Sequence, residues 1–346
     1  MRQILRLSCT ATFAVTVAGC ATSEPRPLDA RAELEVLRGR GLQHFVVARA
    51  KARGELVPQN EPFDPTDGLS EAEVVAVALT LNPELIARRA AVGEAEATLI
   101  AAGLWPNPEV GVSARPGIDG ASGYALEADA LLELLRPRER DARKKVAGAR
   151  VDEVRAEIAA DEFRLVSEVR QQRLAVFAAE RTVAMLIEAV ELRQRTADVV
   201  RRMREIGDAT ELTAAAAELE LAEAGREVRQ AVAQLERERR ELNRLMGLPP
   251  DYDLALTGFG EPLRITLYDT IADDELDQRL LAGRPELRAT EAAYQRAEQE
   301  LRLAVLRQFP RLAVGPAFER ELEGDQSLGL GASLRSAGAL RFARAC

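Results

Sequence analysis

Few residues in this sequence are of the types that do chemistry. It has three cysteines, Cys9, Cys20 and Cys346, and a single histidine, His44. Structural zinc sites take about four Cys or His ligands at recognised spacings, so we expect no metal site. We interpret His44 as an ordinary surface or packing residue. Because no nucleophile–base pair and no phosphate-binding loop is recognisable either, the sequence predicts a protein that is not an enzyme and that needs no cofactor.

Cys20 is the one cysteine in a recognisable motif. Arg2 and Arg6 precede an apolar stretch, residues 7–17, and Val17-Ala18-Gly19-Cys20 follows it. This order is typical of a signal peptide, and the last four residues resemble a bacterial lipobox, where cleavage precedes an acylated cysteine. We therefore expect a signal peptide at 1–19 and a lipid on Cys20, which labelling with a palmitate analogue would detect. The alternative is an ordinary secretory signal that happens to contain a cysteine.

The charge balance excludes one class of partner. The formal net charge is −9, whereas nucleic-acid binding needs a basic face. Charged residues make up 30% of the chain and aromatic residues only 4%, which favours an elongated helical protein over a compact core. The sequence therefore predicts no nucleic-acid partner.

Residues 146–246 form the dominant pattern, which predicts two long helices folded back on each other. No proline interrupts residues 146–205, and apolar residues recur there at helical spacing. In the second arm Leu221, Val228, Leu235 and Leu242 repeat every seven residues, which indicates a seam packed against another helix. A free-standing coiled-coil stalk would show the same pattern, so this stretch alone does not decide between a stalk and a larger assembly.

The turn between these helices is specified by Gly207, which we expect to have a positive φ. Asp208 is expected to cap the second helix, with Glu211 completing a capping box.

Part of the chain recurs at a fixed offset of 202 residues. The segment 82–85, Asn-Pro-Glu-Leu, returns as Arg-Pro-Glu-Leu at 284–287, and Pro108 returns as Pro310. The sequence therefore predicts an internal structural repeat. The expected organisation is a lipidated segment and linker at 20–68, a first repeat at 69–247, a connector at 248–274 and an incomplete second repeat at 275–346.

After each marker proline the apolar period changes from helical to alternating, which predicts a β-hairpin in each repeat. The first spans 108–134, and the second begins near Leu312. The strands have the length that a tilted strand needs to cross a bilayer. Four strands cannot close a barrel, and an open edge cannot face lipid, so three chains would have to share a twelve-stranded wall. The alternative is a small soluble hairpin packed on helices.

With these motifs together, the chain resembles the TolC family of outer-membrane efflux channels. The resemblance rests on the Cys20 lipobox, residues 68–85 (GLSEAEVVAVALTLNPEL), Pro106-Asn107-Pro108-Glu109, the 204–210 turn and the 242–247 segment. It is strongest to the lipoproteins of resistance-nodulation-division (RND) systems, in particular the cobalt-zinc-cadmium branch. It implies a mainly α fold, with a long antiparallel coiled-coil hairpin and short β-hairpins that contribute to a trimeric outer-membrane β-barrel.

The resemblance also implies a function. A homotrimer, lipid-anchored in the outer membrane and extending into the periplasm, would export metals, drugs or other small toxic molecules. It would do so with a periplasmic adaptor protein and an inner-membrane RND-type pump. The tip that meets the adaptor maps onto Arg204, Gly207, Asp208 and Thr210. A lipid-anchored periplasmic coiled-coil scaffold that conducts nothing is the alternative function.

The sequence departs from the family pattern in one respect. The second repeat reaches Cys346 before a second long helical hairpin can follow. We expect a truncated or frame-shifted product that does not form a working duct, with a naturally short variant as the alternative.

Overall fold

A computed structural model of the chain describes residues 29–51, 68–116, 124–134, 136–257, 273–321 and 325–335. The chain divides into two compact units, Met1–Arg40 and Gly41–Cys346. In the first unit the described element is α2 (Ala30–Arg38), capped by the side chain of Asp29. The predicted signal peptide and lipidated Cys20 lie outside the described residues, as does most of the predicted connector.

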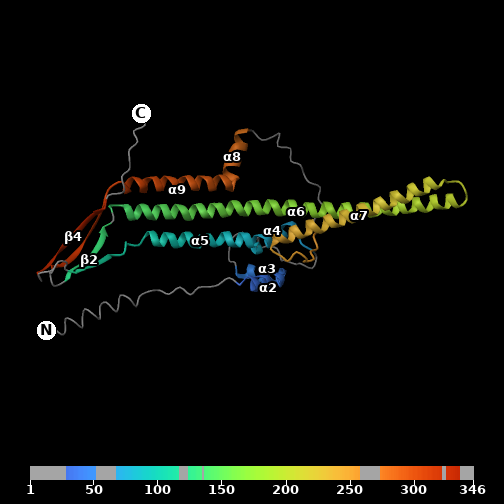
Figure 1. Ribbon diagram of the computed structural model, residues 1–346. Coiled ribbons are helices and arrows are strands. Elements are labelled where there is room, and N and C mark those ends of the chain that lie inside the picture. The colour runs from blue at the N-terminus through green and yellow to red at the C-terminus, as the bar shows by residue number, and fades with distance from the viewer. Residues whose placement is uncertain are drawn as a thin grey trace, which may run out of the picture. The chain divides into compact units, whose positions relative to one another are not determined.

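The second unit is mainly helical with a small antiparallel sheet, which confirms the predicted fold class (Figure 1). It begins with α3 (Leu42–Lys51), α4 (Glu71–Leu81) and α5 (Pro83–Ala102). Ser70 caps α4 in a capping box, with the Glu73 carboxylate accepting a hydrogen bond from the Ser70 N–H at 2.9 Å. Asn82 ends α4 and caps α5, because its Oδ1 accepts from the N–H of Leu85.

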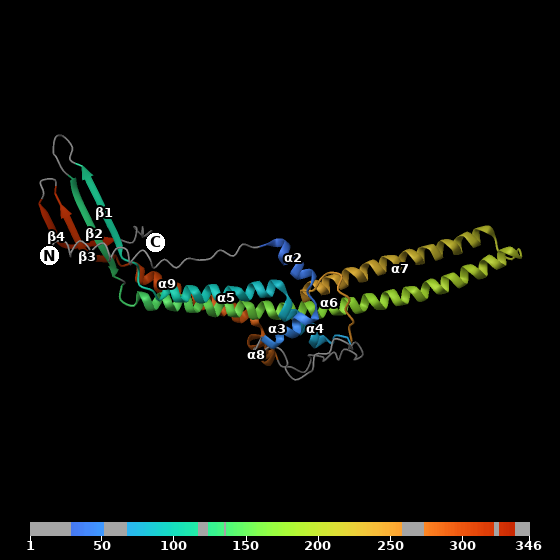
Figure 2. The same ribbon diagram turned by 90° about the horizontal axis from the view of Figure 1, so that it is seen from below.

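The predicted long hairpin consists of α6 (Glu139–Glu205) and α7 (Glu211–Met246). Helix α6 has 67 residues, which at 1.5 Å per residue makes it about 100 Å long. It begins seven residues earlier than the expected start at Val146, because Arg136 and Glu139 hold its first turn. One half of α6 lies against α7, and α5 and α9 (Pro285–Arg307) flank the other half on opposite sides (Figures 1 and 2).

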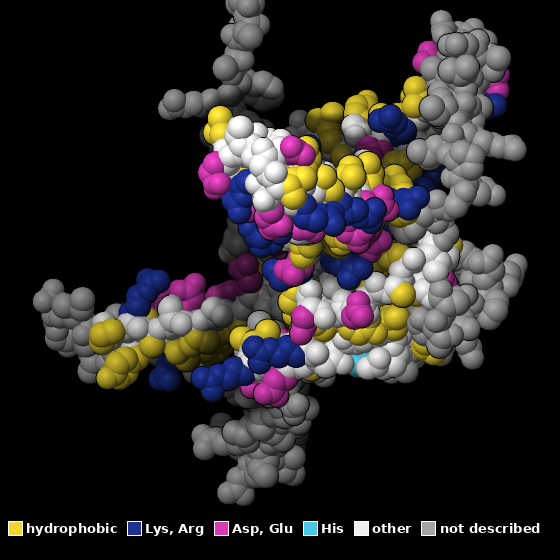
Figure 3. Space-filling view, turned by 90° about the vertical axis from the view of Figure 1, so that its right-hand side faces the viewer, with side chains coloured by type: hydrophobic (Ala, Val, Ile, Leu, Met, Phe, Trp, Pro, Cys, Tyr) yellow, Lys and Arg dark blue, Asp and Glu magenta, His cyan; other side chains and the backbone are white. Residues whose placement is uncertain are grey.

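The seven-residue seam on α7 is confirmed as a packing surface. Leu221, Val228 and Leu235 are half-buried against α6, and Leu242 is fully buried. The exposed faces of the long helices carry basic and acidic side chains next to one another (Figure 3). These helices therefore pack along one stripe and are solvated elsewhere.

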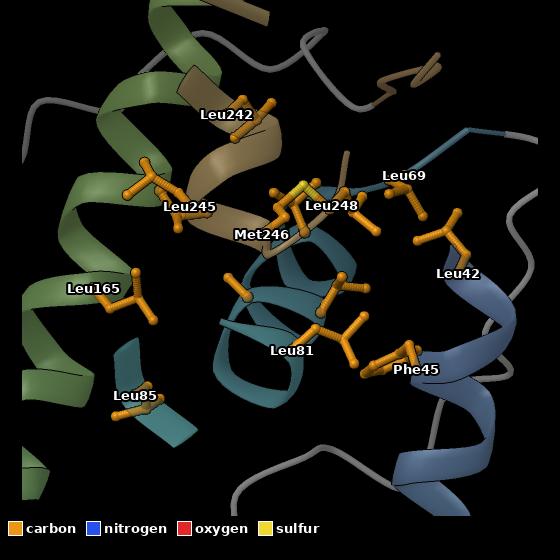
Figure 4. Packing of buried hydrophobic residues seen from close by; sticks show 14 of the residues in the cluster. Leu42, Phe45, Leu69, Leu81, Leu85, Leu165, Leu242, Leu245, Met246 and Leu248 are labelled. Atoms are coloured by element: carbon orange, nitrogen blue, oxygen red, sulfur yellow. The ribbon is translucent and has the colours of Figure 1, made fainter. Parts of the chain in front are cut away.

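The core lies where the long hairpin meets the short helices. Phe45 of α3 packs toward Leu81 of α4, and Met246 lies beside them at the end of α7 (Figure 4). Leu69 and Leu256 form a parallel bridge, which brings the segment after α7 back to the start of α4. Each fully buried side chain of this size contributes about 1.5–3 kcal/mol. This cluster is therefore the part of the unit that holds α3, α4, α6 and α7 together.

Helix α9 is tied to α6 by a buried charge. Arg296 Nε lies 2.7 Å from Glu153 Oε2, and the Glu153 side chain is buried. Burial alone would raise the pKa of Glu153, but hydrogen bonds and charge from Arg150 and Arg296 bring it below its ordinary value. Helix α8 (Asp273–Gly283) precedes α9, and both α5 and α9 open with a proline. The internal duplication itself stays a prediction.

The four strands form one antiparallel sheet in the order β1-β2-β3-β4. They are β1 (Glu109–Pro116), β2 (Tyr124–Leu134), β3 (Arg311–Arg320) and β4 (Gln326–Arg335). The two predicted hairpins are therefore joined through β2 and β3, whose register pairs Ala128 with Phe318. Sequence reasoning predicted each hairpin but not this pairing between them.

Candidate functional site

The register of the sheet gathers its apolar residues on one face. Val112 pairs with Ala128, Ala128 with Phe318, and Phe318 with Leu328. Because side chains alternate along each strand, the residues two positions away lie on the same face. We call this surface the apolar face of the sheet. Its members are Val110, Val112, Ala114, Leu126, Ala128, Ala130, Leu132, Leu134, Leu312, Val314, Pro316, Phe318, Leu328, Leu330, Ala332 and Leu334.

This apolar face is uncovered within the described part of the chain. The Leu330 side chain is 91% exposed and that of Leu328 is 80% exposed. In Figure 3 hydrophobic side chains gather along the lower side of the strands, which project to the left. A contiguous exposed apolar surface of this kind marks a contact with a membrane or with another protein.

The opposite, polar face carries charged and small residues. Arg115 pairs with Glu127 at 3.5 Å, and Arg311 pairs with Glu133 at 3.2 Å. Ser113 Oγ donates a hydrogen bond to Glu127 as well. One face of the sheet is thus mainly apolar and the other mainly polar, which is the pattern of a sheet with one face in water and the other against lipid or protein.

Both edges of the sheet are open in a single chain. Among the described strands, β1 pairs only with β2 and β4 pairs only with β3. Each outer edge therefore presents unpaired backbone N–H and C=O groups, which template pairing with another strand.

The hairpin tip is built by a regular helix end. Gly207 has φ +87°, as predicted, and its N–H donates to the carbonyl of Arg204. The Asp208 N–H donates to the carbonyl of Met203 at 2.8 Å, which completes a Schellman motif. Arg204 also forms an ion pair with Glu211 at 3.2 Å across the turn.

The predicted cap of α7 is wrong. Asp208 does not cap this helix, because its backbone is already used in closing the end of α6. The N-cap is Thr210, whose Oγ1 accepts a hydrogen bond from the N–H of Thr213 at 3.2 Å. Glu211 faces Arg204 and does not complete a capping box.

The structure brings the four predicted tip residues, Arg204, Gly207, Asp208 and Thr210, together at one exposed end of the hairpin. Two apolar side chains join them, Ile206 at 74% exposure and Leu212 at 80%. His44 is exposed, as expected for a surface residue. Over the described residues no group of His, Cys, Asp and Glu is arranged to hold a metal ion. None of the described helices is apolar over the length that a membrane crossing requires.

The junction between the helices and the sheet was not predicted as a site. Arg136 Nε donates to the carbonyl of Phe309 at 2.7 Å and pairs through Nη1 with Glu139 at 3.0 Å. Burial would raise the pKa of Glu139, but hydrogen bonds and charge from Arg136, with Arg311 nearby, bring it below its ordinary value. The concentration of arginine in residues 136–143, directly after a strand, is the sequence signal that could have indicated this junction.

No protein-family model matches this sequence, and no curated protein matches it. Solved structures do. The chain superposes on a membrane protein from Pseudomonas aeruginosa with a TM-score of 0.58 at 19% identity, over 82% of this chain and 73% of that one.

Two further matches are outer-membrane channels. The CmeC outer membrane channel of Campylobacter jejuni gives a TM-score of 0.59 at 14% identity, over 92% of this chain and 69% of that one. The MtrE outer membrane channel of Neisseria gonorrhoeae, solved in its open state, gives 0.56 at 17% identity, over 81% and 72%. At these identities the similarity establishes the fold, and this chain has the fold of outer-membrane channel proteins.

Proposed function

We propose that this chain belongs to a subunit of an outer-membrane channel in a tripartite efflux system, and that its sheet pairs between copies even though the sequence alone predicts no working duct. Such a channel would export metals, drugs or other small toxic molecules together with a periplasmic adaptor and an inner-membrane RND-type pump. The chain would be anchored by a lipid on Cys20, with its sheet in the outer membrane and its long hairpin in the periplasm. The cobalt-zinc-cadmium branch remains our proposal for the type of system.

One observation carries this proposal: the four-stranded sheet with one exposed apolar face and two open edges. Open edges cannot face lipid, because each unpaired backbone group there costs several kcal/mol. Pairing β4 of one copy with β1 of the next would remove every edge when three copies close a ring of twelve strands. The apolar face would then meet lipid, and the polar face would line the lumen.

The alternative is a lipid-anchored periplasmic scaffold that conducts nothing. The regular seam between α6 and α7 is compatible with this alternative as well, because a scaffold would have the same seam. A scaffold would not require an exposed apolar face on the sheet, and it would not require strand pairing between copies. Pairing of β1 with β4 between copies therefore discriminates the two functions.

Disulfide crosslinking between copies tests the shared sheet. We would place one cysteine at Ser113 on β1 and a second on the same polar face of β4, at Ser327, Gly329, Gly331 or Ser333 in turn. The background carries Cys346→Ser so that the last residue cannot react. We expect at least one pairing to crosslink in membranes and to give a ladder of bands that ends at three chains.

The single-cysteine variants are the controls, because each can join at most two chains. If membrane-bound protein gives no crosslink with any of the four pairings, the shared barrel is wrong. A ladder that continues beyond three chains would contradict the trimer.

The hairpin tip is the proposed surface for the adaptor. Exposed Ile206 and Leu212 give it apolar contact area, and the Schellman turn holds its shape. Gly207→Val places a β-branched residue at positive φ, which costs about 1–2 kcal/mol locally and should deform the turn. We expect it to reduce crosslinking from a cysteine at Asp208 to a co-expressed adaptor.

Gly207→Asn is the matched control, because asparagine tolerates the left-handed conformation and should keep the crosslink. Equal crosslinking in the valine and asparagine variants would show that the adaptor does not dock on this turn.

A further inference from the structure

The junction between helices and sheet contains a pocket that the proposed function does not use. It has a volume of about 370 Å³, within the range of small-molecule sites. Helices α5, α6 and α9 and strands β2 and β3 all contribute to it. Its main lining side chains are Trp105, Glu133, Glu139, Arg143, Arg307 and Arg311.

The walls of this pocket are held in place by arginines that bind backbone carbonyls. Arg140 Nε donates to Gly103 at 2.7 Å, and Arg143 Nη2 donates to Leu104 at 2.8 Å. Both carbonyls lie at the end of α5, directly before Trp105. On the other side, Arg136 fixes the end of α9 through the carbonyl of Phe309. The pocket is thus formed by ordered segments, so ligand binding does not include the free-energy cost of ordering them.

The pocket has a small excess of positive charge in a negatively charged protein. Its lining holds three arginines and two glutamates, whereas the whole chain has a net charge of −9. Glu139 is already paired with Arg136 at 3.0 Å. Arg307 is half-exposed and lies 3.7 Å from the same carboxylate, which is a loose pair. Within the described residues, the buried Nε of Arg143 has no hydrogen-bond partner.

An aromatic surface lies beside these cations. Trp105 is 60% exposed although it lines the pocket, so much of its indole is open to a ligand. An indole offers a flat apolar surface for stacking, and a guanidinium binds a carboxylate or a similar anion through paired N–H groups.

We propose that this pocket binds an organic anion with an aromatic ring, the ring against Trp105 and the anionic group between Arg143 and Arg307. Glu133 and Arg311 lie both in the pocket and on the polar face of the sheet. Only under the proposed function would the pocket lie on a transport route, because the polar face would then line the lumen. The binding of the anion does not depend on the proposed function.

The test uses the fluorescence of Trp105, which is the single tryptophan of the chain. Purified full-length protein is titrated with para-nitrobenzoate, an aromatic anion that quenches indole, and in parallel with neutral para-nitrobenzamide. We expect saturable quenching by the anion and a linear, collisional decrease with the amide. Linear quenching by both compounds would overturn the site.

Arg307→Gln should weaken para-nitrobenzoate binding roughly tenfold or more, because a charge-assisted hydrogen bond is lost. The control is Arg201→Gln, which removes a half-exposed arginine near the hairpin tip and should leave the quenching curve unchanged. Unchanged circular dichroism shows that both variants fold. Equal binding by both would also overturn the site.

The two proposals fail separately. Saturable binding without crosslinks between β1 and β4 would leave the pocket standing and refute the channel. Crosslinked trimers with only collisional quenching would leave the channel standing and refute the pocket.

Discussion

Replacing Leu330 by arginine is expected to prevent the sheet from inserting into the outer membrane. Leu330 lies in the middle of β4 on the apolar face and is 91% exposed in the single chain. If this face meets lipid, arginine near the bilayer midplane costs about 2–4 kcal/mol in each subunit. Three subunits would multiply that cost. We expect the variant to be lost from the outer-membrane fraction and to accumulate unassembled or degraded.

The neighbouring position supplies the control. Gly329 lies on the polar face of the same strand, and a Cβ added there would meet no atom within 4 Å. Gly329→Arg should therefore assemble, because its side chain would extend into water. Both variants are compared with residues 1–20 replaced by an ordinary cleavable secretory signal, so that no lipid on Cys20 can retain the chain.

The scaffold alternative predicts the opposite result for Leu330. In a protein that remains in water, arginine at a fully exposed position is neutral for folding. Equal behaviour of Leu330→Arg and Gly329→Arg would thus show that the apolar face does not meet lipid.

Gly247→Ala is expected to destabilise the helical part of the fold strongly. Gly247 has φ +70° at the end of α7, and its N–H donates to the carbonyl of Arg244. An added Cβ would overlap the carbonyl oxygen of Leu81 and crowd the N–H of Asn82. These are backbone atoms at the corner between α4 and α5, so they cannot rotate away as a flexible side chain would.

The expected loss of unfolding free energy has two parts. The left-handed conformation costs about 1–2 kcal/mol for a residue with a Cβ, and forced overpacking costs about 1–3 kcal/mol more. Denaturant unfolding followed by circular dichroism measures the sum. The added Cβ should push the α4–α5 corner away from the end of α7. This movement would also weaken the hydrogen bond that Asn82 Nδ2 donates to the Leu245 carbonyl there.

Gly207→Ala isolates the conformational part. Gly207 has φ +87° too, but a Cβ there would meet nothing within 4 Å. It should cost only the first 1–2 kcal/mol. Gly148→Ala, at an open position inside α6, should be neutral or stabilising, because alanine favours helix over glycine. If Gly247→Ala costs no more than Gly207→Ala, the close approach to Leu81 is not a constraint on the fold.

The helices and strands of this protein follow from local patterns in its sequence. Ser70 with Glu73 marks the start of α4, Pro83 marks the start of α5, and Gly207 marks the turn after α6. Such signals depend on atoms within four or five residues of each other, so a single sequence contains them completely. Alternation likewise predicted each β-hairpin, since the apolar side of a strand can be recognised from its own residues without knowing which strand pairs with it.

The end of α6 shows where local reasoning reached its limit. Asp208 and Thr210 are both good capping residues, and both stand before the apolar pattern of α7. Thr210 is the N-cap of α7, because the backbone N–H of Asp208 takes part in the Schellman motif that ends α6. Two helix ends competed for the same few residues, and only the geometry of the turn decided between them.

The tertiary structure alone decided the long-range pairings. Glu153 looks like one more charge on a solvated helix, yet Arg296, 143 residues later, pairs with it in a buried position. The sheet becomes continuous only because β2 aligns with β3, which places Ala128 against Phe318. The pocket at Trp105 likewise needs three helix ends and two strands to meet. These contacts join residues far apart in the chain, and their free energy depends on the simultaneous packing of every element, which no local period encodes.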